Sequence, residues 1–189
     1  MSSRIRSIAL AGAVVVVVVA VIAVVVTRDG GGADAYTVDG QSVSQKTVSQ
    51  ELSVLVANEL VTSNGNGSVD ARAAAQWLTT RIRSSAVRQL LETNDLELTA
   101  TDRSQIRDQL PAGFARLPQA TQDLVLVFSA GGQLLVDELG EGGANEALAE
   151  VARGFDVSVD PKYGRWVRAR AEVCPPLGCV SISQPAGGG

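Results

Sequence analysis

The hydrophobic pattern of the chain begins with an apolar run that has no polar face. Residues 8–26 read IALAGAVVVVVVAVIAVVV and contain no charge, proline or hydrogen-bonding side chain. At about 1.5 Å per residue, a helix of this length approaches the ~30 Å hydrocarbon core of a bilayer. A core helix of the same length normally carries a polar face, so the run predicts a transmembrane helix.

The charges around this run predict its orientation. Arg4 and Arg6 precede it and no acid does, which predicts that residues 1–7 lie in the cytoplasm and residues 27–189 outside. We expect a single-pass protein of the cell membrane, with residues 27–35 as a linker. The alternative is secretion after cleavage following Ala35, because Ala33-Asp34-Ala35 has the small-x-small form of a signal-peptidase site. The apolar run exceeds the ~7–15 residues of a signal peptide, which favours a retained signal anchor.

After the linker the pattern changes to short β-prone runs and then to helical periodicity. Asp39-Gly40 predicts a hairpin over 36–43, and Ser44 is suited to cap a helix that runs to about Thr62. A second helix is predicted over 70–93, capped by Asp70. Its apolar row has the i, i+4 spacing of a buried face and comprises Ala74, Leu78, Ile82, Ala86 and Leu90. We assign the arginines of this helix to its solvated surface; they are Arg72, Arg81, Arg83 and Arg88.

The following segments continue the helical pattern. Thr101 is predicted to cap a short helix over 102–110, and a fourth helix is expected over 118–139. Its apolar stripe comprises Leu124, Phe128, Leu135 and Leu139. Gly131 and Gly132 stand in its middle, which indicates a kink, a closely passing neighbour or a hinge. A loop over 140–143 and a short helix over 145–153 complete the helical part.

Residues 155–159 alternate apolar and polar side chains, which predicts a strand. We hypothesise that it pairs with the 36–43 hairpin. Beyond Trp166 we expect an irregular tail, 167–189, in which Cys174 and Cys179 form a disulfide around Pro-Pro-Leu-Gly, since a turn of this kind brings two cysteines together. The predicted fold is therefore mainly α, with about five helices in one exported domain, 36–166, and a small β element joining its two ends.

Composition narrows the function classes. Without Arg4 and Arg6, the 16 basic residues become 14, against 20 acidic residues, so 27–189 carries a net charge of −6. This charge argues against nucleic acid and against an anionic membrane surface as partners. The chain has no histidine, which excludes Ser-His-Asp and Cys-His catalysis and histidine metal sites. We predict no catalytic residue, no metal site and no cofactor.

Three stretches together resemble the N-terminal domain of SurA-type periplasmic chaperones and foldases. Residues 38–44 (VDGQSVS) look like the opening hairpin of that family, and 96–102 (LELTATD) are similar to its link into the third helix. Residues 157–166 (VSVDPKYGRW) resemble its closing strand. Family members often carry a parvulin prolyl-isomerase domain, whose active site uses histidines. Since the chain shows no room for that domain and lacks histidine, the resemblance implies chaperone-like binding without isomerase activity.

The expected function is a membrane-tethered domain that binds unfolded or extended segments of exported proteins in a cleft between helices. The candidate lining residues are apolar and largely aromatic: Trp77, Leu78, Phe128, Leu135, Tyr163 and Trp166. Each of them is also suited to fill the core; Tyr163 and Trp166, outside regular helices, are the stronger candidates for exposed contacts. The alternative is a non-catalytic envelope adaptor that holds one specific partner. The oligomeric state stays open.

Overall fold

The computed structural model of the protein describes residues 32–64 and 69–178. The predicted transmembrane segment, 8–26, and Cys179 lie outside these residues. Within the described ranges, no helix combines the length and the apolar character that crossing a bilayer requires. The described chain is mainly helical, with two small sheets, as the sequence predicts for residues 36–166.

A three-stranded sheet joins the two ends of the fold. Strands β1 (Asp34–Val38) and β2 (Gln41–Ser44) form the predicted hairpin, and Asp39 and Gly40 between them both have positive φ, 48° and 79°. Strand β3 (Val157–Val159) pairs antiparallel with the other side of β1. The hypothesised pairing of 155–159 with the hairpin is thus confirmed, and β1 is the central strand.

Helix α1 (Gln45–Ala57) begins where the sequence predicts, because the Ser44 side chain accepts a hydrogen bond from the amide of Thr47. It ends earlier than the predicted Thr62. Glu59 adopts a left-handed conformation with φ 58°, and the amide of Leu60 turns back to the carbonyl of Leu55 at 2.9 Å. This hydrogen-bonded closing turn stops the helix.

Helix α2 (Ala71–Thr93) matches its prediction almost to the residue. Asp70 caps it by accepting a hydrogen bond from the amide of Arg72, and every member of the predicted apolar row is buried. The helix closes like α1, with Asp95 at φ 53° and the amide of Leu96 bonded to the carbonyl of Leu91.

The connection to the last helix holds two short elements. Helix α3 (Ala100–Arg107) is capped by Thr99 and not by the predicted Thr101, because Asp102 bonds back to the Thr99 amide and completes a capping box. The 3₁₀ helix η1 (Ala112–Arg116) follows. A Cβ at Gly113 would lie 2.6 Å from the carbonyl oxygen of Asn58, so only glycine lets η1 pack this closely against the end of α1.

Helix α4 (Gln119–Gly154) absorbs two predicted helices and the loop expected between them. Only Gly140, at φ 73° and ψ 160°, departs from helical geometry, so the break is a kink at one residue. At Gly131 the helix stays regular, and a Cβ there would lie 2.6 Å from a methyl of Val87 on α2; close packing is the reason for that glycine. Leu139, predicted on the buried stripe, is 38 % exposed beside the kink.

Residues 167–178 hold regular elements, which corrects this part of the predicted irregular tail; 179–189 lie outside the described residues. Strands β4 (Arg165–Val167) and β5 (Glu172–Cys174) pair antiparallel, joined by the 3₁₀ helix η2 (Arg168–Arg170). Strand β5 is fastened to α2, because the amide of Val173 donates to the Thr79 hydroxyl at 2.8 Å and Arg83 donates to the Ala171 carbonyl at 2.9 Å. Cys174 is disulfide-bonded and buried; its predicted partner, Cys179, lies outside the described residues.

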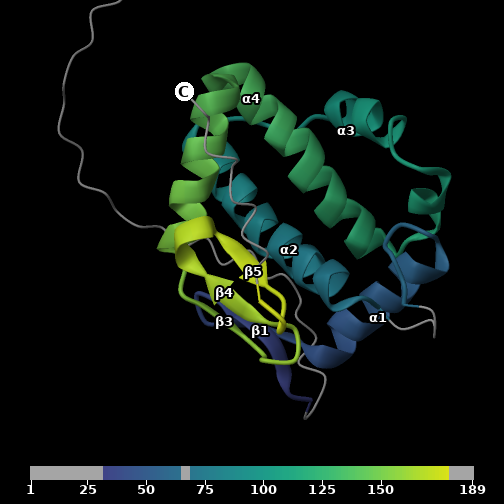
Figure 1. The fold of residues 1–189 in the computed structure, drawn as a ribbon. Helices are drawn as coiled ribbons and strands as arrows, with labels where there is room; N and C mark the ends of the chain where they lie inside the picture. Colours follow the sequence, from purple (N-terminus) through teal and green to yellow (C-terminus); the bar gives the residue numbers. More distant parts are fainter. Residues whose placement is uncertain (1–31, 65–68, 179–189) are drawn as a thin grey trace, which may run out of the picture.

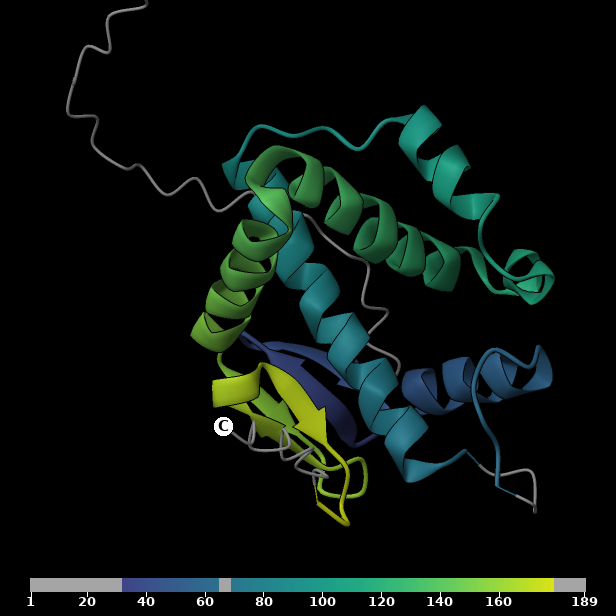
Figure 2. The same ribbon diagram turned by 45° about the horizontal axis from the view of Figure 1, so that its top comes forward.

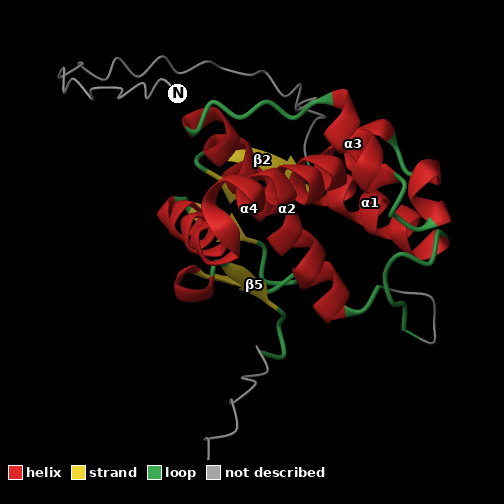
Figure 3. Cartoon of the chain, turned by 90° about the horizontal axis from the view of Figure 1, so that it is seen from above, coloured by secondary structure: helices red, strands yellow, loops and turns green. Residues whose placement is uncertain are grey.

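The elements are arranged around α2, which runs through the middle of the molecule (Figure 1). The strands gather at one end of the fold, and the kink of α4 lies at the opposite end, as Figure 2 also shows. The main core lies between α1, α2, the start of α4 and the sheets, and a second cluster lies between α2 and both halves of α4. Figure 3 places α1 and α3 on the same side of α2.

Candidate functional site

An apolar cleft of about 790 Å³ lies between the end of α1, the first half of α2 and η1. This volume falls within the ~300–1,000 Å³ that ligand pockets usually have. Apolar side chains make up most of its wall: Leu55, Val56, Leu60, Val61, Ala73, Trp77, Leu110, Pro111, Phe114, Leu117 and Val125. The polar residues of the wall are Glu59, Thr62, Ser63, Gln76 and Thr80. The cleft therefore suits a ligand that presents both apolar and polar groups.

Local backbone features shape the walls of the cleft. The closing turn of α1 leads the chain along its edge from Leu60. On the opposite wall, the Gly113 contact with α1 sets the position of η1, which carries Phe114 to the cleft. Phe114 and Leu117 are only 3 % and 4 % exposed, so they form the floor, whereas Val56 and Leu60 are half-buried and border the opening.

A buried polar network lies behind Trp77. The Trp77 indole donates to Glu51 Oε2 at 3.0 Å, and the other carboxylate oxygen of Glu51 pairs with the Arg81 guanidinium. Arg81 Nε also donates to the Tyr36 hydroxyl at 2.7 Å. The network links α1, α2 and β1. It also corrects the assignment of Arg81 to the solvated surface, since the side chains of Arg81 and Glu51 are 13 % and 12 % exposed.

Burial sets the protonation of this network. It raises the pKa of Tyr36 above the ordinary value, and the charge of Arg81 offsets this effect only in part. Burial also acts to lower the pKa of Arg81, but Tyr36 and Glu51 outweigh it, so that pKa lies above its ordinary value. Arg81 therefore stays charged and Tyr36 stays neutral at physiological pH.

The structure does not gather the six predicted contact residues on one surface. Trp77 lines the cleft. Leu78 and Leu135 are fully buried, because their helical rows face the interior, and Phe128 packs half-buried against the second cluster. The two expected exposed contacts also pack inward. Tyr163 is 6 % exposed, with its hydroxyl 3.4 Å from the Ser49 hydroxyl.

Trp166 is half-buried against the main core, and its indole nitrogen has no hydrogen-bond partner among the described residues. Sequence reasoning missed Phe114 and Leu117, which form the cleft floor. They stand between Pro111 and Pro118, a stretch that reads as a connection. The one sequence feature that could have indicated packing on the core is a Phe and a Leu three residues apart in this short segment between two helices.

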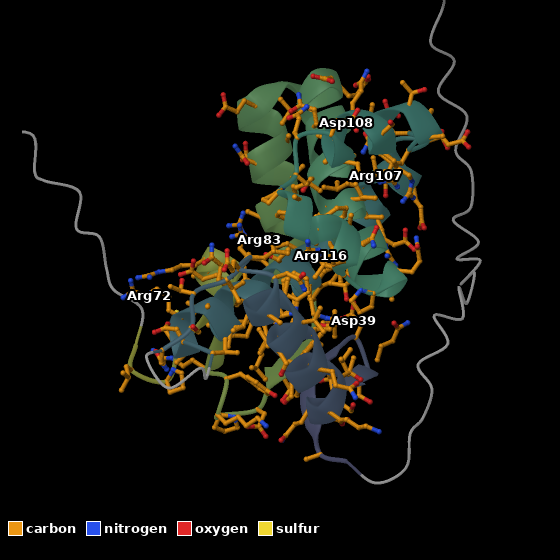
Figure 4. All side chains as sticks on the ribbon, turned by 90° about the vertical axis from the view of Figure 1, so that its right-hand side faces the viewer. Asp39, Arg72, Arg83, Arg107, Asp108 and Arg116 are labelled. Carbon is orange, nitrogen blue, oxygen red and sulfur yellow. The ribbon has the colours of Figure 1, made fainter. Side chains whose placement is uncertain are left out.

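Six charged side chains labelled in Figure 4 do not converge on one point of the fold. They are Asp39, Arg72, Arg83, Arg107, Asp108 and Arg116. In the described part of the chain, no group of three or more acidic or cysteine side chains is placed to hold a metal ion.

In comparisons with known proteins, no family model, curated protein or solved structure matches the chain. The geometry of the cleft therefore carries the functional argument.

Proposed function

We propose that the protein is a membrane-tethered, extracytoplasmic chaperone-like domain that binds unfolded or extended segments of exported proteins, without isomerase activity. The observation that carries this proposal is the apolar cleft between α1, α2 and η1. Its volume accommodates a few apolar side chains of an extended segment rather than a folded partner. The polar residues at its wall supply hydrogen bonds for the backbone of such a segment, which favours low sequence selectivity.

The position of β1 supports a retained tether. Cleavage following Ala35 would remove the first two residues of the central strand. Ala35 is fully buried, and its carbonyl accepts a hydrogen bond from the amide of Asp160 at 2.8 Å. A chain cut there would lose this bond and the burial of Ala35, so the folded domain favours keeping residues 8–26 attached.

The resemblance to SurA-type N-terminal domains points to the same class of ligand, because that family handles unfolded envelope proteins. The opening hairpin and the closing strand that carry the resemblance are adjacent in the sheet. The proposal takes the cleft, and not the isomerase chemistry of the family, as the functional part.

Val56→Glu tests the proposal at the border of the cleft. Val56 lines the cleft and is half-buried, but it belongs to neither apolar cluster, so a carboxylate there should spare the fold. The full chain in lipid nanodiscs should bind a fluorescent apolar peptide and suppress aggregation of an unfolded client near stoichiometric ratio. Val56→Glu should weaken both activities, because the apolar ligand would meet a charge.

Val167→Glu is the matched control, a half-buried valine of β4 that lies outside both the cleft and the clusters. It should bind peptide like the parent chain. Equal binding by the parent and Val56→Glu would refute the role of the cleft. Failure to suppress aggregation, with one partner co-purifying with the full chain, would favour the adaptor function instead. Catalysis of proline isomerisation would contradict the absence of that activity.

A further inference from the structure

A hydrogen-bonded turn at the end of β5 presents an almost fully exposed leucine. Leu177 is 97 % exposed, and the only other exposed large apolar residue in the described ranges, Leu139, is 38 % exposed. The amide of Gly178 bonds to the carbonyl of Pro175 at 2.8 Å and closes the turn. Two prolines precede Leu177, so its backbone is restricted before any partner binds.

The base of this turn is fixed in the fold. Cys174 is buried and disulfide-bonded, and the carbonyl oxygen of Cys174 lies where a Cβ of Gly164 would stand, 1.9 Å away. The chain before it is held by Thr79 and Arg83 of α2. Leu177 is therefore displayed by a preorganised element and not by a loose end of chain.

The segment that carries the turn is basic, although the domain is acidic. Residues 32–160 contain nine basic and 18 acidic residues, a net charge of −9, whereas 161–178 contain four basic residues and one acid, a net charge of +3. The four cations are all exposed: Lys162, Arg165, Arg168 and Arg170. Arg165 stands opposite Cys174 in the β4–β5 pair, next to the turn. The net charge of the whole domain conceals this local excess.

The same end of the molecule receives the predicted tether. The carbonyl of Ala33 accepts from the Gln45 amide at 3.0 Å, and the Gln45 side chain accepts from the Lys162 ammonium. From Lys162 the chain reaches Gly164, which contacts the base of the turn. The six residues from Val26 to Gly32 span at most about 20 Å when extended. A bilayer that held residues 8–26 would therefore lie within about 20 Å of Gly32, at the end of the fold that carries the turn.

We propose that this turn and its cations dock the domain on an anionic lipid surface, namely the bilayer that holds the tether. Leu177 inserts among the acyl chains, while Arg165 and Lys162 contact lipid phosphates. The inference rests on the tether of the proposed function and is independent of peptide binding in the cleft. Docking would fix which face of the domain points away from the membrane.

The test uses the full chain in vesicles of dibrominated phosphatidylcholine and phosphatidylglycerol at a ratio of about 3:1. Leu177→Trp adds a fluorophore at the turn, and bromine quenches it only by contact within the bilayer. Leu139→Trp is the matched control, because the α4 kink beside Leu139 lies at the far end of the fold from the strands (Figure 1). The parent chain corrects for its two native tryptophans.

We expect a larger loss of fluorescence for Leu177→Trp than for Leu139→Trp. Adding Arg165→Gln and Lys162→Gln should reduce that loss. Raising NaCl from about 0.1 M to about 1 M should do the same, because it shortens the Debye length from about 10 Å to about 3 Å. Arg107→Gln on α3 should leave the loss unchanged.

Equal quenching of Leu177→Trp and Leu139→Trp would overturn the docking proposal. The proposal would also be overturned if the tryptophan of Leu177→Trp became protected from solvent only after a protein partner was added. Quenching that is identical in pure phosphatidylcholine would overturn the role of anionic lipid. A chain that urea washes off the vesicles would refute the tether and the docking together. Loss of peptide binding by Val56→Glu, with quenching retained at position 177, would show that the two sites are separate.

Discussion

Replacing Arg81 with methionine tests whether the network behind the cleft stabilises the fold. The guanidinium pairs with Glu51 and donates to Tyr36, and both partners are inside the protein. Arg81→Met would leave the Glu51 carboxylate, 12 % exposed, with only the Trp77 indole as a hydrogen-bond donor within residues 32–64 and 69–178. Removing one member of a buried ion pair typically costs about 3–5 kcal/mol.

The double variant separates the pair from its surroundings. Glu51→Gln keeps an oxygen that can accept from Trp77, so Glu51→Gln with Arg81→Met leaves no buried charge. We expect this double variant to lose less than about 2 kcal/mol, because replacing a whole buried pair is often neutral. The two single costs should therefore not add, and the coupling energy should reach at least about 2–3 kcal/mol, the upper part of the usual range for residues in contact.

Urea denaturation of the chain in mild detergent, followed by far-UV circular dichroism, measures these differences. With a slope of about 2 kcal/mol per molar urea, a loss of about 4 kcal/mol lowers the midpoint by about 2 M. The reasoning is refuted if Arg81→Met costs less than about 1 kcal/mol, or if the costs of the two single substitutions simply add in the double variant.

Three further predictions concern backbone fit and pH. Gly131→Ala should lower stability by about 1 kcal/mol, because overpacking against α2 exceeds the gain in helix propensity. Gly132→Ala has open space around it and should raise stability by about 0.5–1 kcal/mol. Thermal unfolding of both variants checks these opposite signs. Gly164 has φ 125° and lies against the Cys174 carbonyl, so Gly164→Ala should lower stability by about 3 kcal/mol or more and accelerate amide exchange in β5. Unchanged exchange in β5 would contradict the close contact. Folding raises the pKa of Tyr36, so the neutral Tyr36 side chain contributes fully to stability below about pH 10, and this contribution is lost as the pH rises above that value. Tyr36→Phe should therefore reduce the fall in the free energy of unfolding that urea titrations at alkaline pH measure.

Local signals predicted the elements that depend on local chemistry. Ser44 and Asp70 cap helices as expected, because an N-cap needs only a side-chain oxygen beside the first free amides. The alternation over 155–159 predicted a strand, and the 36–43 hairpin was the one element with which this strand was expected to pair. Where two cap residues competed, the capping box decided for Thr99 over Thr101.

The sequence pattern did not predict the contacts between distant parts of the chain. Arg81 stands among helix positions that look solvated, and its partners lie 30 and 45 residues away, so no periodicity reveals its burial. Strands β4 and β5 have three residues each, which is too short to show an alternating pattern. The cleft depends on a concave arrangement of η1 against α1, and hydrophobic periodicity identifies which residues are apolar but not where a surface is hollow.

The central position of β1 has a consequence for the order of biosynthesis. Asp39, in the turn after β1, accepts a hydrogen bond from the amide of Asp156, 117 residues later. At about 5–20 residues per second, a ribosome takes roughly 6–23 s to make that stretch. Before β3 and α4 are synthesised, one edge of β1 has no partner strand and the apolar face of α2 is not covered by α4. A domain proposed to bind unfolded segments of other proteins thus passes through a partly unfolded state during its own synthesis.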